Sequence, residues 1–240
     1  MAIDIDTPKE EELNYHYKYP HPSVTTDCVI FGFDGRQLRV LLIRRGVDPY
    51  KDQWAFPGGF VKIDESAEQG ALRELREETG LETAYIKQFH TFSEPGRDPR
   101  ERVITIAYYA LVKLQDVLGG DDAAEARWWP IDEIPPLAFD HEEILKTALK
   151  ELKREIYFEP VGFELLPEKF TIREMQTLYE AILNVKFDRR NFYNKLRHTA
   201  VVNQLNASAN PSSKRPTFLF NFNAKNYEIM KDEDGLRTEF

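Results

Sequence analysis

The stretch "GGFVKIDESAEQGALRELREETGL", residues 58–81, contains six acidic and three basic side chains, and it predicts a helix that follows a tight turn. Ser66, with Gln69 three residues later, forms a capping-box pattern, and Gly80 is placed to end the helix in the left-handed conformation. The apolar stripe between these two ends is predicted to consist of Ala67, Ala71, Leu72 and Leu75.

Three carboxylates of this helix share a second face, because Glu74, Glu77 and Glu78 are spaced i, i+3 and i+4. Like charges at this spacing destabilise an exposed helix by about 0.2–0.5 kcal/mol per pair. A divalent cation removes that repulsion and turns the face into a binding site. Since oxygen-only ligands favour Mg²⁺ or Mn²⁺ over zinc, we expect one of these two ions.

The turn before the helix is suited to a ligand that the backbone approaches closely, because it contains Pro57, Gly58 and Gly59. Glu65 lies at the helix entrance beside this turn, and Arg73 lies four residues before Glu77, where it can orient that carboxylate. A metal ion held here can polarise a phosphoryl oxygen and activate water, as cleavage of a pyrophosphate link requires. The alternative is a surface helix with scattered Glu–Arg pairs.

Residues 59–81 read G-x5-E-x7-R-E-L-x-E-E-x-G-L, and this pattern resembles the Nudix box of the Nudix hydrolases. The resemblance covers about residues 20–155 and implies an α/β/α sandwich that hydrolyses a nucleoside diphosphate linked to another group. It implies metal ligation by Glu74, Glu77 and Glu78 with help from Glu65 and the Gly59 carbonyl, and an orienting role for Arg73. This catalytic set is consistent with a Mg²⁺-dependent enzyme.

The loop "SEPGRDPRERV" (93–103), together with "AYYALV" (107–112), resembles the ADP-ribose pyrophosphatase branch of that family. Arg97, Arg100 and Arg102 are candidate contacts for a diphosphate or ribose, since arginine matches phosphate geometry bidentately. A solvated loop is the alternative. Trp54 is a candidate for stacking on a base or for packing in the core.

Glu94, Asp98 and Glu101 are candidates for a catalytic base, and the sequence does not choose among them. His141 follows Asp140 at the predicted start of a late helix, where it is interpreted as part of the local capping structure.

Apolar and β-branched runs predict strands around the acidic helix. Residues 23–33 and 37–45 flank "DGR" as a hairpin, 82–92 and 102–114 form further strands, and 126–131 form a closing strand. A helix is predicted over 140–156. The fold class is α+β, with an N-terminal extension (1–20), a sandwich domain (21–156), a Pro- and Gly-containing linker (157–170) and a basic module (171–240).

Charge separates these modules. Residues 160–225 contain 10 Lys and Arg against 5 Asp and Glu, whereas residues 1–159 contain 20 against 31. The asymmetry indicates two modules with different partners. The single Cys28 and the absence of a signal peptide or a long apolar run favour a cytoplasmic protein without membrane insertion.

The basic module contains a helix-turn-helix pattern. Thr171 and Glu174 begin its first helix, and Asp188 begins the second, with Phe192 and Leu196 pointing inward. Arginine and asparagine on the opposite face can pair with guanine and adenine edges, and a hairpin tip can meet phosphates. The candidate DNA-binding residues are Arg189, Arg190, Tyr193, Asn194 and Arg197 on the helix, with Lys214 and Arg215 at the tip.

The sequence "FTIREMQTLYEAIL…DRRNFYNKLRH" resembles the winged helix of Nudix-related transcriptional regulators. The resemblance implies a homodimer that binds double-stranded DNA and senses a small ligand, ADP-ribose or L-arabinose according to the branch. Many such regulators have eroded boxes, whereas this chain keeps every glutamate. Two alternatives stay open: a plain ADP-ribose pyrophosphatase without DNA binding, and a sugar-responsive regulator with a silent site.

Overall fold

The computed structural model describes residues 17–81, 85–117, 123–199, 201–210 and 217–228. Its N-terminal domain is built on one sheet with the order β3-β2-β1-β6-β5, to which β4 adds on β1 and β7 adds on β2. The strands are β1 (Ser23–Phe33), β2 (Leu38–Arg45), β3 (Trp54–Ala55), β4 (Gly58–Phe60), β5 (Tyr85–Phe92), β6 (Val103–Leu111) and β7 (Ala123–Pro130).

The long strand β1 organises the sheet. It pairs antiparallel with β2, which confirms the predicted hairpin, and parallel with β6. It also pairs with the short strand β4, so that Gly58 faces Asp27 and Gly59 faces Thr26. Strands β3 and β4 are too short to produce a recognisable alternation and were not expected from the sequence. The β1–β4 pairing brings the glycine turn to the middle of the sheet.

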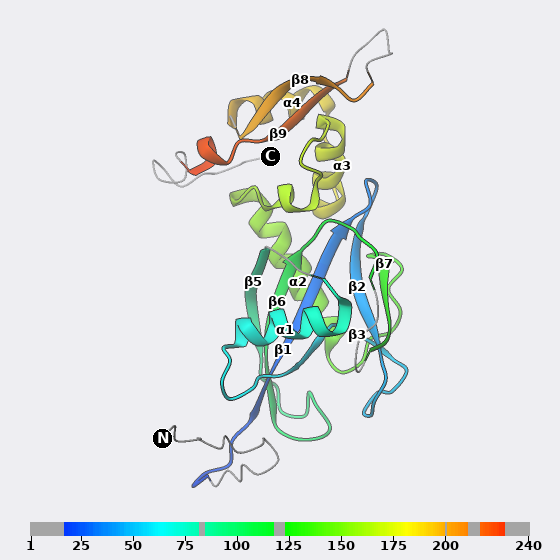
Figure 1. Cartoon of the computed structure of the whole chain (residues 1–240), viewed down its shortest axis with the longest axis vertical. Coiled ribbons are helices and arrows are strands. Elements are labelled where there is room, and N and C mark those ends of the chain that lie inside the picture. Colours follow the sequence, from blue (N-terminus) through cyan, green and yellow to red (C-terminus); the bar gives the residue numbers. More distant parts are fainter. Residues whose placement is uncertain (1–16, 82–84, 118–122, 200, 211–216, 229–240) are drawn as a thin grey trace, which may run out of the picture.

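Helices cover both faces of this sheet, with α1 (Ala67–Thr79) on one side and α2 (His141–Phe158) on the other (Figure 1). Alternation along β1 explains the two layers. Ile30 packs in the cluster that contains Leu75 of α1, whereas Val29 and Phe31 pack in the cluster that contains Leu152 of α2. The expected α/β/α sandwich is confirmed.

The C-terminal domain stands at the end of the molecule opposite the beginning of β1 (Figure 1). Its capping box joins Thr171 to Glu174, as predicted. Two helices are followed by a two-stranded antiparallel sheet, which confirms the expected winged helix-turn-helix. The elements are the 3₁₀ helix η2 (Val161–Leu165), α3 (Ile172–Leu183), α4 (Arg189–Thr199), β8 (Val202–Ser208) and β9 (Phe218–Phe222).

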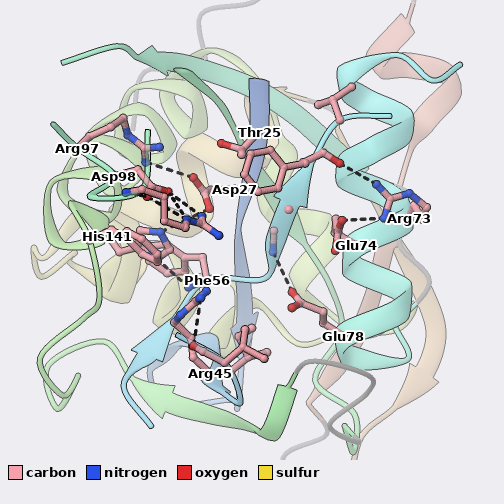
Figure 2. A pocket seen from close by; sticks show the side chains of 18 of the residues that line it. Thr25, Asp27, Arg45, Phe56, Arg73, Glu74, Glu78, Arg97, Asp98 and His141 are labelled. Carbon is pink, nitrogen blue, oxygen red and sulfur yellow. Dashed lines mark hydrogen bonds and ion pairs between the residues drawn. The ribbon is translucent and has the colours of Figure 1, made fainter. Parts of the chain in front are cut away.

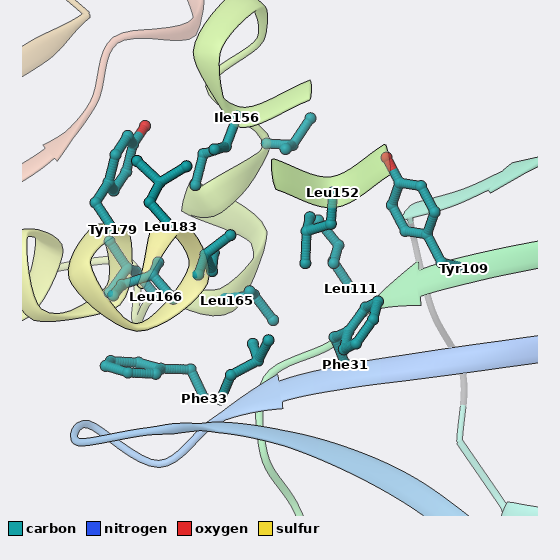
Figure 3. Close-up of a cluster of buried hydrophobic side chains, with 14 of the residues drawn as sticks. Phe31, Phe33, Tyr109, Leu111, Leu152, Ile156, Leu165, Leu166, Tyr179 and Leu183 are labelled. Carbon is teal, nitrogen blue, oxygen red and sulfur yellow. The ribbon is translucent and has the colours of Figure 1, made fainter. Parts of the chain in front are cut away.

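One continuous core joins the two domains, as Figure 3 shows. Phe31 and Phe33 of β1 belong to the same buried cluster as Ile156 of α2, and Tyr179 and Leu183 of α3. The segment predicted as a linker, 157–170, contains the end of α2 and η2, and it contributes the buried residues Val161, Leu165, Leu166 and Phe170. The connection is therefore a packed interface, whereas linkers are usually exposed and flexible.

Hydrogen bonds fasten the end of α2 to both domains. Glu155 accepts hydrogen bonds from Tyr85 and Tyr109 of the sheet, and Glu159 accepts one from Tyr227 of the C-terminal domain. These contacts fix α2 relative to its neighbours. Within the described ranges, no helix is both long and apolar enough to cross a membrane.

Candidate functional site

A cavity of about 400 Å³ opens on the sheet between α1, the loop 93–102 and the start of α2 (Figure 2). It is rich in charged side chains from sequence segments far apart. The charged or titratable residues that line it are Asp27, Arg45, Lys62, Arg73, Glu74, Glu78, Arg97, Asp98, Arg100 and His141. Aromatic and aliphatic side chains complete its wall.

The two glycines of the turn let the carboxylates of α1 approach the backbone. The backbone N–H of Gly58 donates to Glu78 Oε2 at 2.9 Å, and Glu78 as a residue is only 7% exposed. A Cβ atom at Gly59 would lie 2.2 Å from Glu74 Oε1, and one at Gly58 would lie 2.2 Å from the Thr26 carbonyl. Neither position tolerates a side chain without displacing this arrangement.

Arg73 organises the acidic face of α1. It donates to Glu65 at 2.7 and 3.0 Å, to Glu74 at 2.7 Å and to Glu77 at 2.9 Å. The predicted partner was Glu77 alone, and the structure adds two further carboxylates. The hydrogen bond from Arg73 lowers the pKa of Glu65 to about 2. Burial raises the pKa of Glu74 in spite of its own bond to Arg73.

The donor chemistry of this face fits a hard divalent cation, because every candidate ligand is an oxygen. Glu74 and Glu78 line the cavity, whereas Glu77 lies outside its lining and has a 42% exposed side chain. Among the described residues, no three acidic, histidine or cysteine side chains are grouped closely enough to hold a metal as they stand. Arg73 is bonded to two of the predicted ligands, Glu74 and Glu77, through one oxygen of each carboxylate.

At the opposite wall of the cavity, one hydrogen-bonded network joins Arg97 with Asp140, Asp27 and Thr105. Arg97 donates to both oxygens of Asp140 at 2.7 and 2.9 Å and lies 3.4 Å from Asp27 Oδ2. Thr105 donates to the same oxygen of Asp27 at 2.7 Å. With a side chain only 5% exposed, Arg97 is neutralised by protein carboxylates. The Asp140 side chain accordingly makes no cap to α2.

His141 belongs to this wall as well. Its Nδ1 accepts the backbone N–H of Phe56 at 3.0 Å, and its Nε2 lies 3.5 Å from Asp27 Oδ1. Burial lowers the pKa of His141, so the neutral ring carries its proton on Nε2, facing Asp27. The interpretation of His141 as local capping structure missed this position, because its partners lie 85 and 114 residues earlier in the chain.

The remaining loop candidates fall in different places. Arg100 lines the cavity and donates to Asp98 at 2.7 Å. Burial alone would raise the pKa of Asp98, but hydrogen bonds from Arg100 lower it overall. Arg102 is not part of the cavity lining and reaches the neighbouring Val103 carbonyl at 3.5 Å. Trp54 is also outside the lining and packs edge-on against Trp129, with ring centroids 5.2 Å apart.

Of the three candidate bases, Asp98 alone lines the cavity. Glu101 instead accepts a hydrogen bond from Ser23 at 2.7 Å, and Glu94 is exposed in the turn before Arg97. Geometry therefore favours Asp98, and its lowered pKa keeps it ionised at neutral pH.

The second helix of the C-terminal domain presents a basic outer face. Phe192 and Leu196 are buried, as predicted, and Asp188 accepts the backbone N–H of Asn191 at 2.9 Å as an N-cap. The candidates on the other face are Arg189, Arg190, Asn194 and Arg197, which are exposed, and Tyr193, which is half-buried. Lys214 and Arg215 lie outside the described residues.

Comparison with known proteins assigns both domains. Residues 21–152 match the NUDIX domain, and residues 162–222 match the NrtR DNA-binding winged helix domain. The chain belongs to the Nudix-related transcriptional regulators. The ADPR responsive transcriptional repressor NtrR of Acinetobacter baylyi is 31% identical over 237 residues, which cover 95% of this chain and 94% of the relative.

Two solved structures resemble this chain, one along most of its length and one over the Nudix domain alone. Shewanella oneidensis NrtR complexed with a 27mer DNA superposes with a TM-score of 0.74 at 29% identity, covering 85% of this chain and 95% of that one. The NUDIX domain of the same protein complexed with ADP ribose gives a TM-score of 0.53 at 35% identity, covering 58% of this chain and 94% of that domain. Nudix hydrolases generally use a divalent metal ion.

The Nudix box supplies only part of the cavity wall, and segments outside the box supply the rest. The box contributes one wall through α1 and its glycine turn. The other wall contains Asp27, Arg45 and His141, none of which the box includes. Two sequence signals point to this wall. Asp27 is an aspartate inside an otherwise apolar strand, and His141 directly follows the first residue of a predicted helix.

Proposed function

We propose that this protein is a transcriptional regulator that binds double-stranded DNA through its winged helix and responds to ADP-ribose or a related nucleotide sugar in its Nudix cavity. The observation that carries the proposal is the joining of an intact Nudix cavity to a basic winged helix by one packed core. The likeness to NtrR along 95% of the chain supports it. A transcriptional regulator of this kind would act in the cytoplasm.

The proposed DNA-binding state is a homodimer. A dimer would place its two winged helices at half-sites that lie one helical turn, about 34–36 Å, apart on the same face of the DNA. Ligand binding then changes DNA affinity only if it favours one arrangement of the dimer over another. Light scattering with and without DNA measures the number of chains in the complex.

A titration tests the proposal. A labelled DNA fragment from the neighbourhood of the gene is titrated with protein at low and at moderate salt, with fluorescence anisotropy as the readout. We expect binding that weakens with salt and that changes when ADP-ribose, but not L-arabinose, is added. A response to the pentose alone would assign the chain to a sugar-responsive regulator, and a lack of binding to every such fragment at low salt would contradict DNA regulation.

Hydrolysis is a second candidate activity, favoured by the full set of box carboxylates. Glu74 and Glu78 would hold Mg²⁺ or Mn²⁺, and the Gly58 N–H and Arg73 would orient these two carboxylates. The metal ion supplies polarisation of a phosphoryl oxygen and an activated water. Asp98, ionised and facing the cavity, is the chain's own group available to accept a proton.

This activity predicts metal-dependent release of AMP and ribose 5-phosphate from ADP-ribose. The variant Glu78→Gln should reduce turnover at least about 100-fold, since it removes a charged ligand while keeping the hydrogen bond from Gly58. Chromatography of the products measures it. Turnover that survives Glu78→Gln would exclude this carboxylate from the chemistry, and turnover without any DNA affinity would identify a plain hydrolase.

A further inference from the structure

Four arginines line the Nudix cavity, and three of them are neutralised by the protein. Arg73 is bonded to glutamates of the box, Arg97 to Asp140 and Asp27, and Arg100 to Asp98. Arg45 differs from them, because the described residues place no carboxylate within ion-pairing distance of its guanidinium. A cation that faces a polar cavity without an acidic partner is suited to an anion brought by the ligand.

Arg45 is held in a fixed position before any ligand arrives. Its Nε donates to the Pro49 carbonyl at 2.8 Å, and its Nη2 lies 3.4 Å from the Val47 carbonyl. These two acceptors are neutral, so they orient the guanidinium without cancelling its charge. The remaining N–H groups of the fork can bond a phosphate.

An aromatic ring supports this arginine. The guanidinium carbon of Arg45 lies 4.9 Å from the ring centroid of Phe139, and that of Arg100 lies 5.9 Å from the same centroid. Phe139 has a φ of 53°, in the left-handed region that bulky residues rarely adopt. Such backbone conformations persist where surrounding structure imposes them, and they cluster at ligand sites.

The electrostatics of the cavity also favour an anion at Arg45. Burial lowers the pKa of Arg45 and the positive charge of Arg100 lowers it further, while the carboxylates of Glu78, Asp98 and Asp27 offset these effects only in part. A negatively charged group placed between the two arginines relieves both effects. Figure 2 shows Arg45 and Arg73 on different sides of the cavity, so such a group would also face the carboxylates and any metal on α1.

We propose that Arg45 binds the diphosphate of the nucleotide ligand from the side of the cavity away from α1, with Phe139 as the surface on which its guanidinium rests. This inference rests on the proposed function and assigns a phosphate contact that lies outside the Nudix box and outside loop 93–102. Arg97, by contrast, is a positioning residue that joins that loop to the start of α2.

Calorimetry on the full chain tests this assignment with three probes: ADP-ribose, inorganic pyrophosphate and adenosine. The variant is Arg45→Gln, and the matched control is Arg44→Gln, which changes the preceding arginine, a half-buried residue outside the cavity lining that is paired with Glu125 at 3.7 Å. We expect Arg45→Gln to weaken ADP-ribose and pyrophosphate at least about tenfold, since a hydrogen bond to a charged group is worth about 1.5–3 kcal/mol. Arg44→Gln should leave the affinities for ADP-ribose and pyrophosphate unchanged. Adenosine, which has no phosphate, should bind to wild type and to both variants alike.

A second variant, Arg45→Lys, keeps the charge but removes the fork, so its affinity should lie between those of wild type and Arg45→Gln. Equal affinity of wild type and Arg45→Gln for both phosphorylated probes would overturn the assignment. If wild type binds pyrophosphate through Arg45 but not ADP-ribose, the proposed ligand fails and the assignment stands. If wild type binds neither, both are overturned.

Discussion

The Nudix cavity and the outer face of α4 both contain arginines, but the two regions differ in whether carboxylates of the protein pair with them. In the cavity, Arg73, Arg97 and Arg100 are each bonded to carboxylates. On α4, the described residues offer no carboxylate within ion-pairing distance of Arg189, Arg190 or Arg197, and all three are exposed. Most cavity arginines are therefore neutralised by the protein, whereas the arginines of α4 are exposed to solvent.

The difference follows from the kind of partner that each region meets. A buried charge is costly unless the protein pairs it, so a cavity for a small ligand must be neutralised in advance, except where the ligand supplies the counter-charge. An exposed arginine stays hydrated at little cost, and DNA phosphates neutralise it while releasing counterions. Among the cavity arginines, Arg45 resembles those of α4 in having no ion-paired carboxylate in the described part of the chain, although it is half-buried.

The largest expected effect is on the α4 side of this comparison. Replacing Arg190 and Arg197 together by alanine should weaken DNA binding by about 100-fold or more, because each contact to a base edge or phosphate contributes about 1–3 kcal/mol. Fluorescence anisotropy measures the loss, and ADP-ribose affinity should be unchanged. Arg154→Ala, which removes an exposed arginine of α2, serves as the control. An unaffected double variant would remove α4 as the recognition helix.

An intermediate effect is expected in the core that connects the two regions. Leu166→Ala should lower the free energy of unfolding by about 2–4 kcal/mol, since this side chain is buried between the domains. Urea unfolding should show a single transition when followed by tryptophan fluorescence, which reports on the Nudix domain, and by far-ultraviolet circular dichroism. Two separated transitions in the wild-type chain would show that the regions are independent bodies.

The smallest expected effect concerns pH and the Arg73 network. The pKa of Glu65 falls from 4.5 to about 2 in the folded chain, so the ion pair stabilises the fold above pH 4.5 and loses this contribution as the pH falls towards 2. Because the ion pair is half-buried and partly screened by water, we expect Glu65→Gln to cost about 1 kcal/mol at pH 7. Chemical unfolding at pH 7 and pH 3 measures the difference, which should narrow at the lower pH. A constant difference would assign the effect to packing.

Local features of this fold were readable in the sequence because their causes lie within a few residues. The capping boxes at Ser66 and Thr171, the left-handed Gly80 and the cap at Asp188 all have the geometry that their patterns predict. Their hydrogen bonds join residues three or four positions apart, so no knowledge of the tertiary fold was needed.

The far wall of the cavity could not be read in the same way. Arg97 finds Asp140 43 residues later and Asp27 70 residues earlier, and this meeting depends on sheet order and helix placement. The sequence assigns the loop arginines to the ligand without showing that Arg97 is already bonded to protein carboxylates, and its contact with a ligand stays a prediction. Similarly, the prolines and glycine of 157–170 indicated a linker, whereas the packing of Leu165 and Leu166 depends on α3.

Helix α2 reaches from the ligand cavity, where His141 begins it, to the shared core around Ile156. Its 18 residues span about 27 Å at a rise of about 1.5 Å per residue. If α2 rotates as a rigid body about its first turn, a rotation of about 3° displaces its last turn by about 1.4 Å. The displacement caused by a small rotation of α2 would therefore be largest at its last turn, which packs in one cluster with α3, the neighbour of the proposed DNA-binding helix α4.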